Sequence, residues 1–485
     1  MSRTPPRAAL VLALAGLVLR AGAEVLPGRL PGGLQLVFPR GTKAGENPVL
    51  ATMDSLLVNG NIAARPGQRV SLNVAGLPVE LLPDGRFATQ IPFPTDRRLV
   101  LDWAIDDLPF QTVQRLDSPA PAPAPVTPAA PGWVTSGSPL KLSTAPGASY
   151  WLFPDAGTPL LLGDATRGGS RVLLCEGLEA WLPASTRLDR LASAPERPAR
   201  VGSIVVDEDG LGLRFSCAGG PLPVWLETDA RAAVIRLLLP GAVAAIDRVR
   251  LAPAGPLLSV EWEPRPGPLL ELRLQLEPGS VDGARVQWQG NQLALSLNPR
   301  EHSLRDWNVV LDPGHGGSEL GCVGASGTSE AELNLLLAQE IGARLEQAGA
   351  RVHYTRTDER TVSLDARVAF ADSVKADFFL SVHHNSTSAD GDPRATNGYS
   401  VYWWNGFSAE PARLLHEGLC EGPFADDGLF WRSLAVCRQE GRPALLLEAG
   451  TLINPDEETL LLQPQTRHRQ SRLIVQALKE YLRGD

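Results

Sequence analysis

The stretch Asn308-Val309-Val310-Leu311-Asp312-Pro313-Gly314-His315-Gly316-Gly317 decides the fold of the C-terminal third of the chain. Its first four residues are typical of a buried strand, and the glycines around His315 let the backbone turn sharply and let a ligand approach the imidazole. Residues 330–348 follow with apolar side chains three and four positions apart, the spacing of one helix face. Strands and helices alternate from there onward. Residues 305–485 are therefore predicted to form an α/β domain with a mainly parallel sheet flanked by helices, with its functional residues at the strand ends.

Three further motifs place chemically active side chains at ends of predicted elements. Ser381-Val382-His383-His384-Asn385-Ser386 ends an apolar strand, and Leu445-Leu446-Leu447-Glu448 ends another. Ser329-Glu330-Ala331-Glu332 opens the predicted helix. Neighbouring side chains on a strand point to opposite faces, so one of the two adjacent histidines is expected to bind a metal while the other serves substrate or structure. Two histidines and a glutamate form a recognised catalytic zinc shell, and a further glutamate is the expected base.

The order of these motifs adds a resemblance to a known family. The runs DPGHGG, EAELNL, YTRTDERTVSLDAR, SVHHNS and PALLLEAGTLINPDEE resemble the zinc-dependent N-acetylmuramoyl-L-alanine amidases of the Amidase_3 type over about residues 305–485. The resemblance implies a Zn²⁺ cofactor held by the metal ligands His315, Glu330 and His383. It also implies that Glu448 is the catalytic carboxylate.

The other polar residues of these motifs keep two interpretations each. Asn385 is either a substrate hydrogen-bonding residue or a structural one, and His384 is either a substrate contact or structural. Glu332 matches a variable acidic position and is expected to be a solvated helix residue. Thr451 stands where the family often has Phe, and Asp372 where it often has Asn, so both are expected to affect substrate fit. No long inserted helix that would block the site is expected between residues 405 and 430.

The resemblance implies a secreted peptidoglycan hydrolase that acts in cell-wall remodelling or daughter-cell separation. The bond cleaved would be the amide between N-acetylmuramic acid and L-alanine of the stem peptide. Two alternatives remain open: another zinc amide hydrolase, such as a peptidase or deacetylase, and a non-catalytic wall-binding regulator. The expected partners are peptidoglycan and cell-division or cell-wall regulators.

The remainder of the chain predicts N-terminal all-β modules ahead of the α/β domain, so the fold class is multidomain. Residues 24–117 resemble an immunoglobulin-like module, residues 133–196 an SH3-like module, and residues 199–299 an AMIN-like domain. Residues 118–132 form a Pro/Ala linker, because six prolines in fifteen residues favour an extended spacer. Removing residues 24–299 is expected to weaken binding to cell-wall sacculi and to leave hydrolysis of soluble muropeptides intact.

Residues 1–23 predict a signal peptide, with a basic start, an apolar run and a small-residue cleavage site. The mature chain is therefore expected to be exported to the periplasm or cell envelope, with no transmembrane segment. The whole chain has 485 residues and a net charge of -9, and a balance this acidic argues against a nucleic-acid partner.

The five cysteines leave two possibilities open. An exported protein can form disulfides, and the pairs Cys175 with Cys217 and Cys420 with Cys437 are candidates. Buried free thiols are the other possibility.

Overall fold

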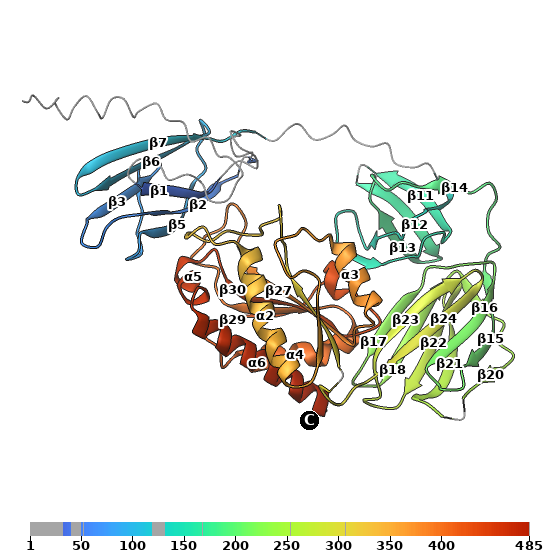
Figure 1. Cartoon of the computed structure of the whole chain (residues 1–485). Helices are drawn as coiled ribbons and strands as arrows, with labels where there is room; N and C mark the ends of the chain where they lie inside the picture. The colour runs from blue at the N-terminus through green and yellow to red at the C-terminus, as the bar shows by residue number, and fades with distance from the viewer. Residues whose placement is uncertain are drawn as a thin grey trace, which may run out of the picture.

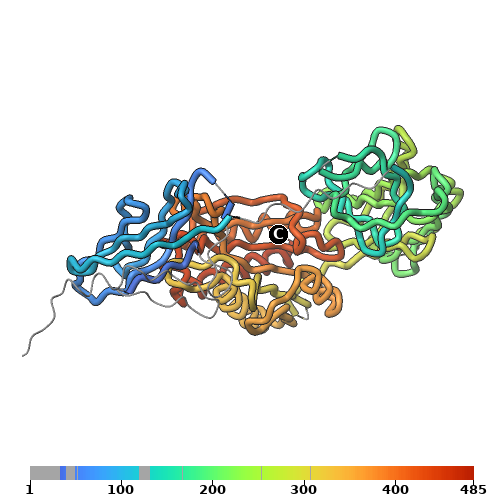
Figure 2. Tube along the Cα trace, turned by 90° about the horizontal axis from the view of Figure 1, so that it is seen from above, coloured from blue at the N-terminus to red at the C-terminus, as the bar shows by residue number. Residues whose placement is uncertain are grey.

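The computed structural model describes residues 33–39, 50–51, 53–118, 131–166, 168–252, 254–305 and 307–484. The predicted signal peptide and residues 119–130 of the predicted linker lie outside the described residues. The α/β domain lies in the middle of an elongated arrangement, with the first β module on one side and the two later β regions on the other (Figures 1 and 2).

The first β region is a two-sheet sandwich. Its strands bury one shared cluster of apolar side chains that includes Leu56, Phe87 and Trp103. One sheet has the order β1 (Leu34–Phe38), β2 (Ser55–Ile62), β5 (Arg86–Pro92). The other has the order β4 (Leu77–Pro78), β3 (Val70–Val74), β6 (Arg98–Ile105), β7 (Leu108–Arg115).

The second β region forms one seven-stranded sheet around its own small core, which includes Leu142, Val172 and Ala180. The strands, in spatial order, are β10 (Tyr150–Leu152), β9 (Leu142–Ser143), β13 (Leu178–Leu182), β12 (Gly169–Cys175), β11 (Leu160–Thr166), β8 (Gly132–Thr135) and β14 (Asp189–Arg190).

The third β region packs two sheets around a shared core that includes Phe215, Leu237 and Leu272. The predicted hairpin around Gly290-Asn291 is confirmed, because Gln289 pairs with Gln292 in an antiparallel ladder. One sheet contains β19 (Ala242–Ala244), β15 (Ala199–Val206), β16 (Gly212–Ala218), β24 (Gln292–Pro299) and β23 (Val281–Gln289), with β20 (Val249–Arg250) beside β15. The other contains β17 (Trp225–Asp229), β18 (Val234–Pro240), β22 (Leu269–Leu276) and β21 (Leu257–Arg265). The immunoglobulin-like, SH3-like and AMIN-like assignments of the three regions remain predictions.

The C-terminal domain is built on a mixed six-stranded sheet. In spatial order the strands are β26 (Arg351–Tyr354), β25 (Asn308–Pro313), β27 (Phe378–Asn385), β30 (Ala444–Thr451), β28 (Tyr399–Trp403) and β29 (Asp426–Trp431). The first four run parallel, whereas β28 is antiparallel to β30 and β29 is parallel to β28. The parallel strands β25, β27 and β30 therefore end at one edge of the sheet, where the predicted motifs meet.

Helices cover both faces of this sheet (Figure 1). Apolar side chains of the helices on one face form the larger core with Val309, Leu380 and Leu447. Those on the other face pack on Val310, Phe379 and Leu446 in a smaller core. The first group comprises α2 (Glu330–Gln347), α4 (Ala409–Leu419) and α6 (Pro464–Arg483), and the second comprises α3 (Leu364–Ser373) and the 3₁₀ turn η3 (Ala435–Cys437). Two short elements, η2 (Gly406–Ser408) and α5 (Pro455–Leu461), complete the domain.

Sequence reasoning missed strand β29 and helix α5. β29 is a strand at the edge of the sheet that carries Gly428 and only partly buried or exposed side chains, so its apolar alternation is weak. α5 has seven residues and begins with an Asn454 cap followed by Pro455, a start signal for a helix too short to show a period. Between residues 405 and 430, α4 packs on α6 as part of the larger core and forms no plug.

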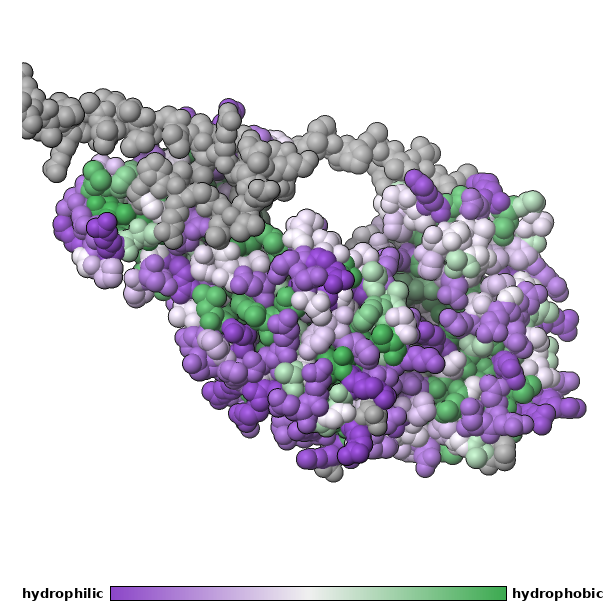
Figure 3. Space-filling model, viewed as in Figure 1, coloured by the Kyte–Doolittle hydropathy of each residue, from purple (hydrophilic) through white to green (hydrophobic). Residues whose placement is uncertain are grey.

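The surface is mostly hydrophilic on the face drawn in Figure 3, with hydrophobic residues in separate patches. Among the described residues, no helix is both long and apolar enough to cross a bilayer.

The proposed disulfides are wrong for this structure, in which all five cysteines are free thiols. Cys437 is buried in the smaller core of the C-terminal domain, whereas Cys420 lies exposed at the end of α4. Burial raises the pKa of Cys437 to about 12, so this thiol acts as an apolar side chain.

The unusual Asp372 has a packing role. Its carboxylate is bound by Arg442 at 2.8 Å and by Arg285, which belongs to the third β region. Desolvation opposes ionisation here, but hydrogen bonds from the two arginines hold the pKa of Asp372 below its usual value. The departure from Asn therefore supplies a charge that joins two domains.

Candidate active site

The first motif loop presents His315 from the end of β25. His315 has a backbone φ of 59°, and Gly316 and Gly317 after it are also in the positive-φ region, so the loop turns back at once. Gly314 has a second function. A Cβ atom at this position would lie 2.2 Å from the ring of His383, so only glycine lets the β27 histidine approach this loop.

Glu330 is the first residue of α2, and Ser329 caps the helix by accepting a hydrogen bond from the backbone N–H of Glu332. One Glu330 oxygen, Oε2, accepts from the backbone N–H of Cys322 at 3.0 Å. Burial disfavours the charged form, but hydrogen bonds with His315 and His383 hold the pKa of Glu330 well below its ordinary value. Glu330 is therefore an ionised carboxylate, the form that binds a cation. Glu332, by contrast, is exposed, as predicted.

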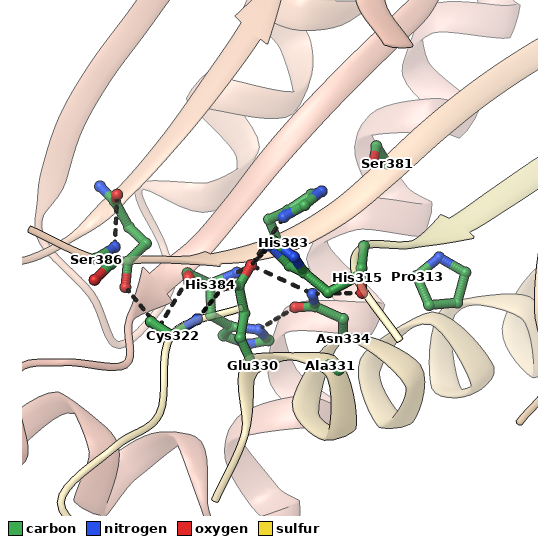
Figure 4. Close-up of polar contacts among 12 residues, drawn as sticks. Pro313, His315, Cys322, Glu330, Ala331, Asn334, Ser381, His383, His384 and Ser386 are labelled. Carbon is green, nitrogen blue, oxygen red and sulfur yellow. Dashed lines mark hydrogen bonds and ion pairs between the residues drawn. The ribbon is translucent and has the colours of Figure 1, made fainter. Parts of the chain in front are cut away.

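Three of the predicted residues converge on one point (Figure 4). The Oε1 atom of Glu330 lies 3.2 Å from His315 Nε2 and 2.8 Å from His383 Nδ1. The three ligand atoms all lie within 4.8 Å of one another. The His315 side chain is 33% exposed, so solvent reaches the cluster from that side.

Glu448 lies beside this cluster on the neighbouring strand. It pairs with His383 in the parallel register of β27 and β30, and its side chain shares the sheet face of Leu446. Its Oε2 atom is buried and has no hydrogen-bond partner among the described residues. Burial, reinforced by the negative charge of Glu330 and offset in part by His383, raises the pKa of Glu448 to about 7. A carboxylate whose pKa is raised in this way is suited to exchange protons near neutral pH.

His384 points to the opposite face, as the strand alternation predicts. It is 3% exposed, and its Nδ1 lies 2.8 Å from Asn334 Oδ1 on α2. Burial lowers its pKa to about 4, so the ring is neutral and donates its Nδ1 proton to this amide oxygen. The ring is closed off from solvent, which favours the structural role over a substrate contact, and both remain predictions.

Asn385 follows at the end of β27. Its Oδ1 accepts from the backbone N–H of Ser386 at 2.8 Å, and its Nδ2 donates to Asp427 at 3.4 Å. The side chain is partly exposed, so it remains available to a substrate.

Aromatic residues lie farther along the sheet, in and next to β28 and β29. Glu448 pairs with Ser400 on β28, and two positions along the strands, on the same face, Leu446 pairs with Tyr402. Tyr402 stacks on Phe430 of β29, with ring centroids 5.2 Å apart. Trp404 and Trp431 stack beyond them, with centroids 4.7 Å apart and planes at 4°.

Comparison with known proteins identifies the family to which the C-terminal domain is similar. The model of the Amidase_3 family, described as N-acetylmuramoyl-L-alanine amidase, matches residues 309–480. A probable cell wall amidase LytH of Staphylococcus epidermidis is 31% identical over 218 residues, which cover 43% of this chain and 70% of that protein.

The chain belongs to the N-acetylmuramoyl-L-alanine amidase family.

One more relative and one solved structure are also similar to this amidase. A probable cell wall amidase LytH of Staphylococcus saprophyticus is 32% identical over 209 residues, covering 42% of this chain and 67% of that protein. The solved catalytic domain of the amidase CwlV from Bacillus (Paenibacillus) polymyxa var. colistinus is 32% identical, covers 36% of this chain and 98% of its own, and has a TM-score of 0.34. The enzyme class predicted from the motifs is confirmed, and the chain is a cell wall amidase.

The amidase residues present fit a zinc ion. Two imidazole nitrogens and a carboxylate oxygen are ligands that zinc accepts in catalytic sites, and three protein ligands leave a position open. The unpartnered Glu448 oxygen next to them is a buried polar atom that still needs a hydrogen-bond donor.

Sequence reasoning missed two arginines that hold the amidase loop carrying His315. Arg356 is 1% exposed and donates to the carbonyl oxygens of Pro313 and Gly314 at 3.0 and 2.9 Å. Arg367 donates to the His315 carbonyl at 2.8 Å and pairs with buried Asp312. Both lie in the run YTRTDERTVSLDAR, and their places in that run were the sequence signal that could have found them. Which strand end they reach depends on tertiary packing.

Proposed function

We propose that this amidase is a zinc-dependent, exported peptidoglycan hydrolase. Its proposed reaction is hydrolysis of the amide between the lactyl group of N-acetylmuramic acid and L-alanine of the stem peptide, in wall remodelling or daughter-cell separation. The observation that carries the proposal is the unpartnered, buried oxygen of Glu448 beside the cluster of His315, Glu330 and His383.

In this proposal His315, Glu330 and His383 hold the metal. Zinc bound there supplies Lewis-acid activation of water and of the scissile carbonyl. Glu448 takes a proton from the attacking water and returns it to the leaving amine of L-alanine. Burial supports the role of proton carrier, because it raises the pKa of Glu448 and so favours its holding the proton between the two steps.

The residues around the ligands support the same role by holding them still. Asn334 donates to the Gly314 carbonyl at 3.1 Å and accepts from His384, which joins α2 to β25 and β27. Arg367 binds the carbonyl of His315 itself. Partners of this kind orient metal ligands, and losing one typically costs about 10–100-fold in metal affinity or activity.

The test is mass spectrometry of muropeptides digested by the full chain, with and without a chelator. Free stem peptides that begin with L-alanine, lost on chelation and restored by zinc, are the expected products. Products from cleavage within the stem peptide or of an N-acetyl group would instead identify the other zinc hydrolases. Intact muropeptides after zinc loading would favour the wall-binding regulator and reject the proposal.

A further inference from the structure

The first β region contacts the two loops that border the metal cluster. From β2, Asn59 donates to the Val323 carbonyl at 3.0 Å and Asn61 to the Ala325 carbonyl at 2.8 Å. Val323 and Ala325 belong to residues 322–330, the segment that leads into Glu330. The sandwich therefore touches the chain within seven residues of a proposed metal ligand.

The second contact is on the loop that follows β27. The backbone N–H of Leu57 donates to the Ala389 carbonyl at 2.7 Å, and Ser55 Oγ donates to the Asp390 carbonyl at 2.8 Å. β27 carries His383 immediately before this loop. One β-sheet thus binds both segments, although they come from different parts of the sequence. Figure 1 shows this sheet next to α5 and the site edge of the domain.

A buried ion pair lies at the centre of this interface. Arg86 of β5 pairs with Glu458 of α5 at 2.8 Å, and their side chains are 7% and 0% exposed. The other Glu458 oxygen accepts hydrogen bonds from the backbone N–H and Oγ of Ser326 at 3.0 and 2.6 Å. Glu458 therefore joins the first β region to residues 322–330, and its buried charge depends on Arg86 because an unpaired buried carboxylate is strongly unfavourable.

Residues 322–330 connect Glu458 to Glu330 in space, and they are packed closely enough that a displacement of Glu458 would move Glu330. A Cβ atom on Gly324 would lie 2.2 Å from Glu458 Oε1, so the turn is pressed against that carboxylate. The Gly324 N–H donates to the Thr328 carbonyl at 3.0 Å, and Val323 forms a β-bridge with Ser329, the cap of α2. Cys322 at the other end donates to Glu330.

We propose that Arg86, a residue of a separate β module, is a positioning residue for the metal ligand Glu330. It acts through Glu458 and the segment of residues 322–330, so the first β region is part of the framework of the active site. This inference rests on the proposed metal site, and it goes beyond a wall-binding role for the module.

The test compares Arg86→Gln with the double variant R86Q/E458Q in the full chain. The first leaves a buried carboxylate unpaired, whereas the second leaves a neutral pair that can still hydrogen-bond. We expect R86Q to weaken zinc binding by about tenfold, the low end for partners that orient ligands, and the double variant to recover part of that loss. Zinc affinity is measured by competition with a chromophoric chelator. Hydrogen–deuterium exchange of residues 322–330 is expected to quicken in the metal-free R86Q protein.

Arg69→Gln is the matched control, because Arg69 pairs with Asp107 in the same module and both side chains are more than three-quarters exposed. R69Q is expected to match the wild type in both measurements. Unchanged zinc affinity and unchanged exchange in R86Q would overturn the inference. A wild-type chain that binds no zinc would instead reject the proposed function, while the metal-free exchange measurement would still test the role of Arg86.

Discussion

At the scale of single residues, the site depends on carboxylates that are held away from water, although a charged carboxylate is more stable when it is hydrated. Glu330 stays ionised because it is hydrogen-bonded by two histidines, whereas one oxygen of Glu448 is buried without a hydrogen-bond partner among the described residues. The same residue type thus has two roles set by environment. Glu330 is suited to bind a cation and Glu448 to move a proton.

Glu448→Gln tests the second role. The amide is nearly the same size but cannot take a proton, so we expect hydrolysis of muropeptides to fall by about 10²–10⁴-fold, the usual contribution of a general base. Zinc content, measured by atomic emission, should stay equal to that of the wild type. Full activity in E448Q would remove this residue from the mechanism.

The pH dependence follows from the same carboxylate. Only the deprotonated form accepts a proton, and burial raises the pKa of Glu448 to about 7, although a nearby zinc ion would lower it. We expect kcat/KM to rise with pH below about 7 and then level off. Zinc content is measured at each pH, because protonation of the histidine ligands also reduces activity in acid. A rate that rises as the pH falls from 7 to 5 would contradict this assignment.

At the scale of elements, close approach of strands and loops builds the site. The loop after β25 reaches β27 only because Gly314 has no side chain where the His383 ring lies. The motif glycines could be recognised from the sequence, but which histidine they admit depends on the neighbouring strand.

Gly314→Ala tests this contact. The backbone φ of Gly314 is not in the positive region, so alanine adds a clash rather than a forbidden conformation. We expect weaker zinc binding, by about tenfold or more, because a displaced ligand loses its geometry. Gly137→Ala is the control, since a Cβ atom there meets nothing within 4 Å. Equal zinc affinities in the two variants would show that the loop adjusts freely.

At the scale of the whole molecule, the β regions are packed on the amidase domain through buried polar contacts. Asp282 of β23 accepts a hydrogen bond of 2.6 Å from Tyr481 of α6. Arg300 binds Glu410 of α4 at 3.0 Å and stacks over the Tyr481 ring. These contacts join the third β region to two helices of the larger core.

Asp282 predicts a pH-dependent stability. Burial raises its pKa to about 7, above the ordinary 3.8, so between these values the folded chain binds a proton that the unfolded chain releases. The free energy of unfolding that the protonated Asp282 contributes is therefore lost as the pH rises from about 4 to 7. We expect the Tm of Asp282→Asn to fall less between pH 5 and 8 than that of the wild type. An identical fall in both proteins would rule out this group.

Truncation is the second prediction at this scale. The sequence suggested that residues 24–299 could be removed without harming hydrolysis of soluble muropeptides, and the structure changes that expectation. Their removal takes Arg86 away from Glu458 and Arg285 away from Asp372, which keeps its ion pair with Arg442. We expect the truncated domain to have a Tm several degrees lower, because it loses the ion pairs and hydrogen bonds that these residues make with it. A truncated domain with the Tm and specific activity of the full chain would show that these contacts are dispensable.

The sequence by itself determined the amidase family, the α/β alternation and the identity of the chemically active residues. Strand ends, turn glycines and a small number of histidines are local features, and they can be recognised along the chain. Only the tertiary structure decided which side chains meet. It turned His384 toward Asn334, left a Glu448 oxygen without a partner in the described part of the chain, paired Asp372 with Arg285 and brought Arg86 to Glu458. The physical reason is that these contacts join segments far apart in sequence, and their energies depend on burial and on the partner, neither of which is encoded in the local pattern.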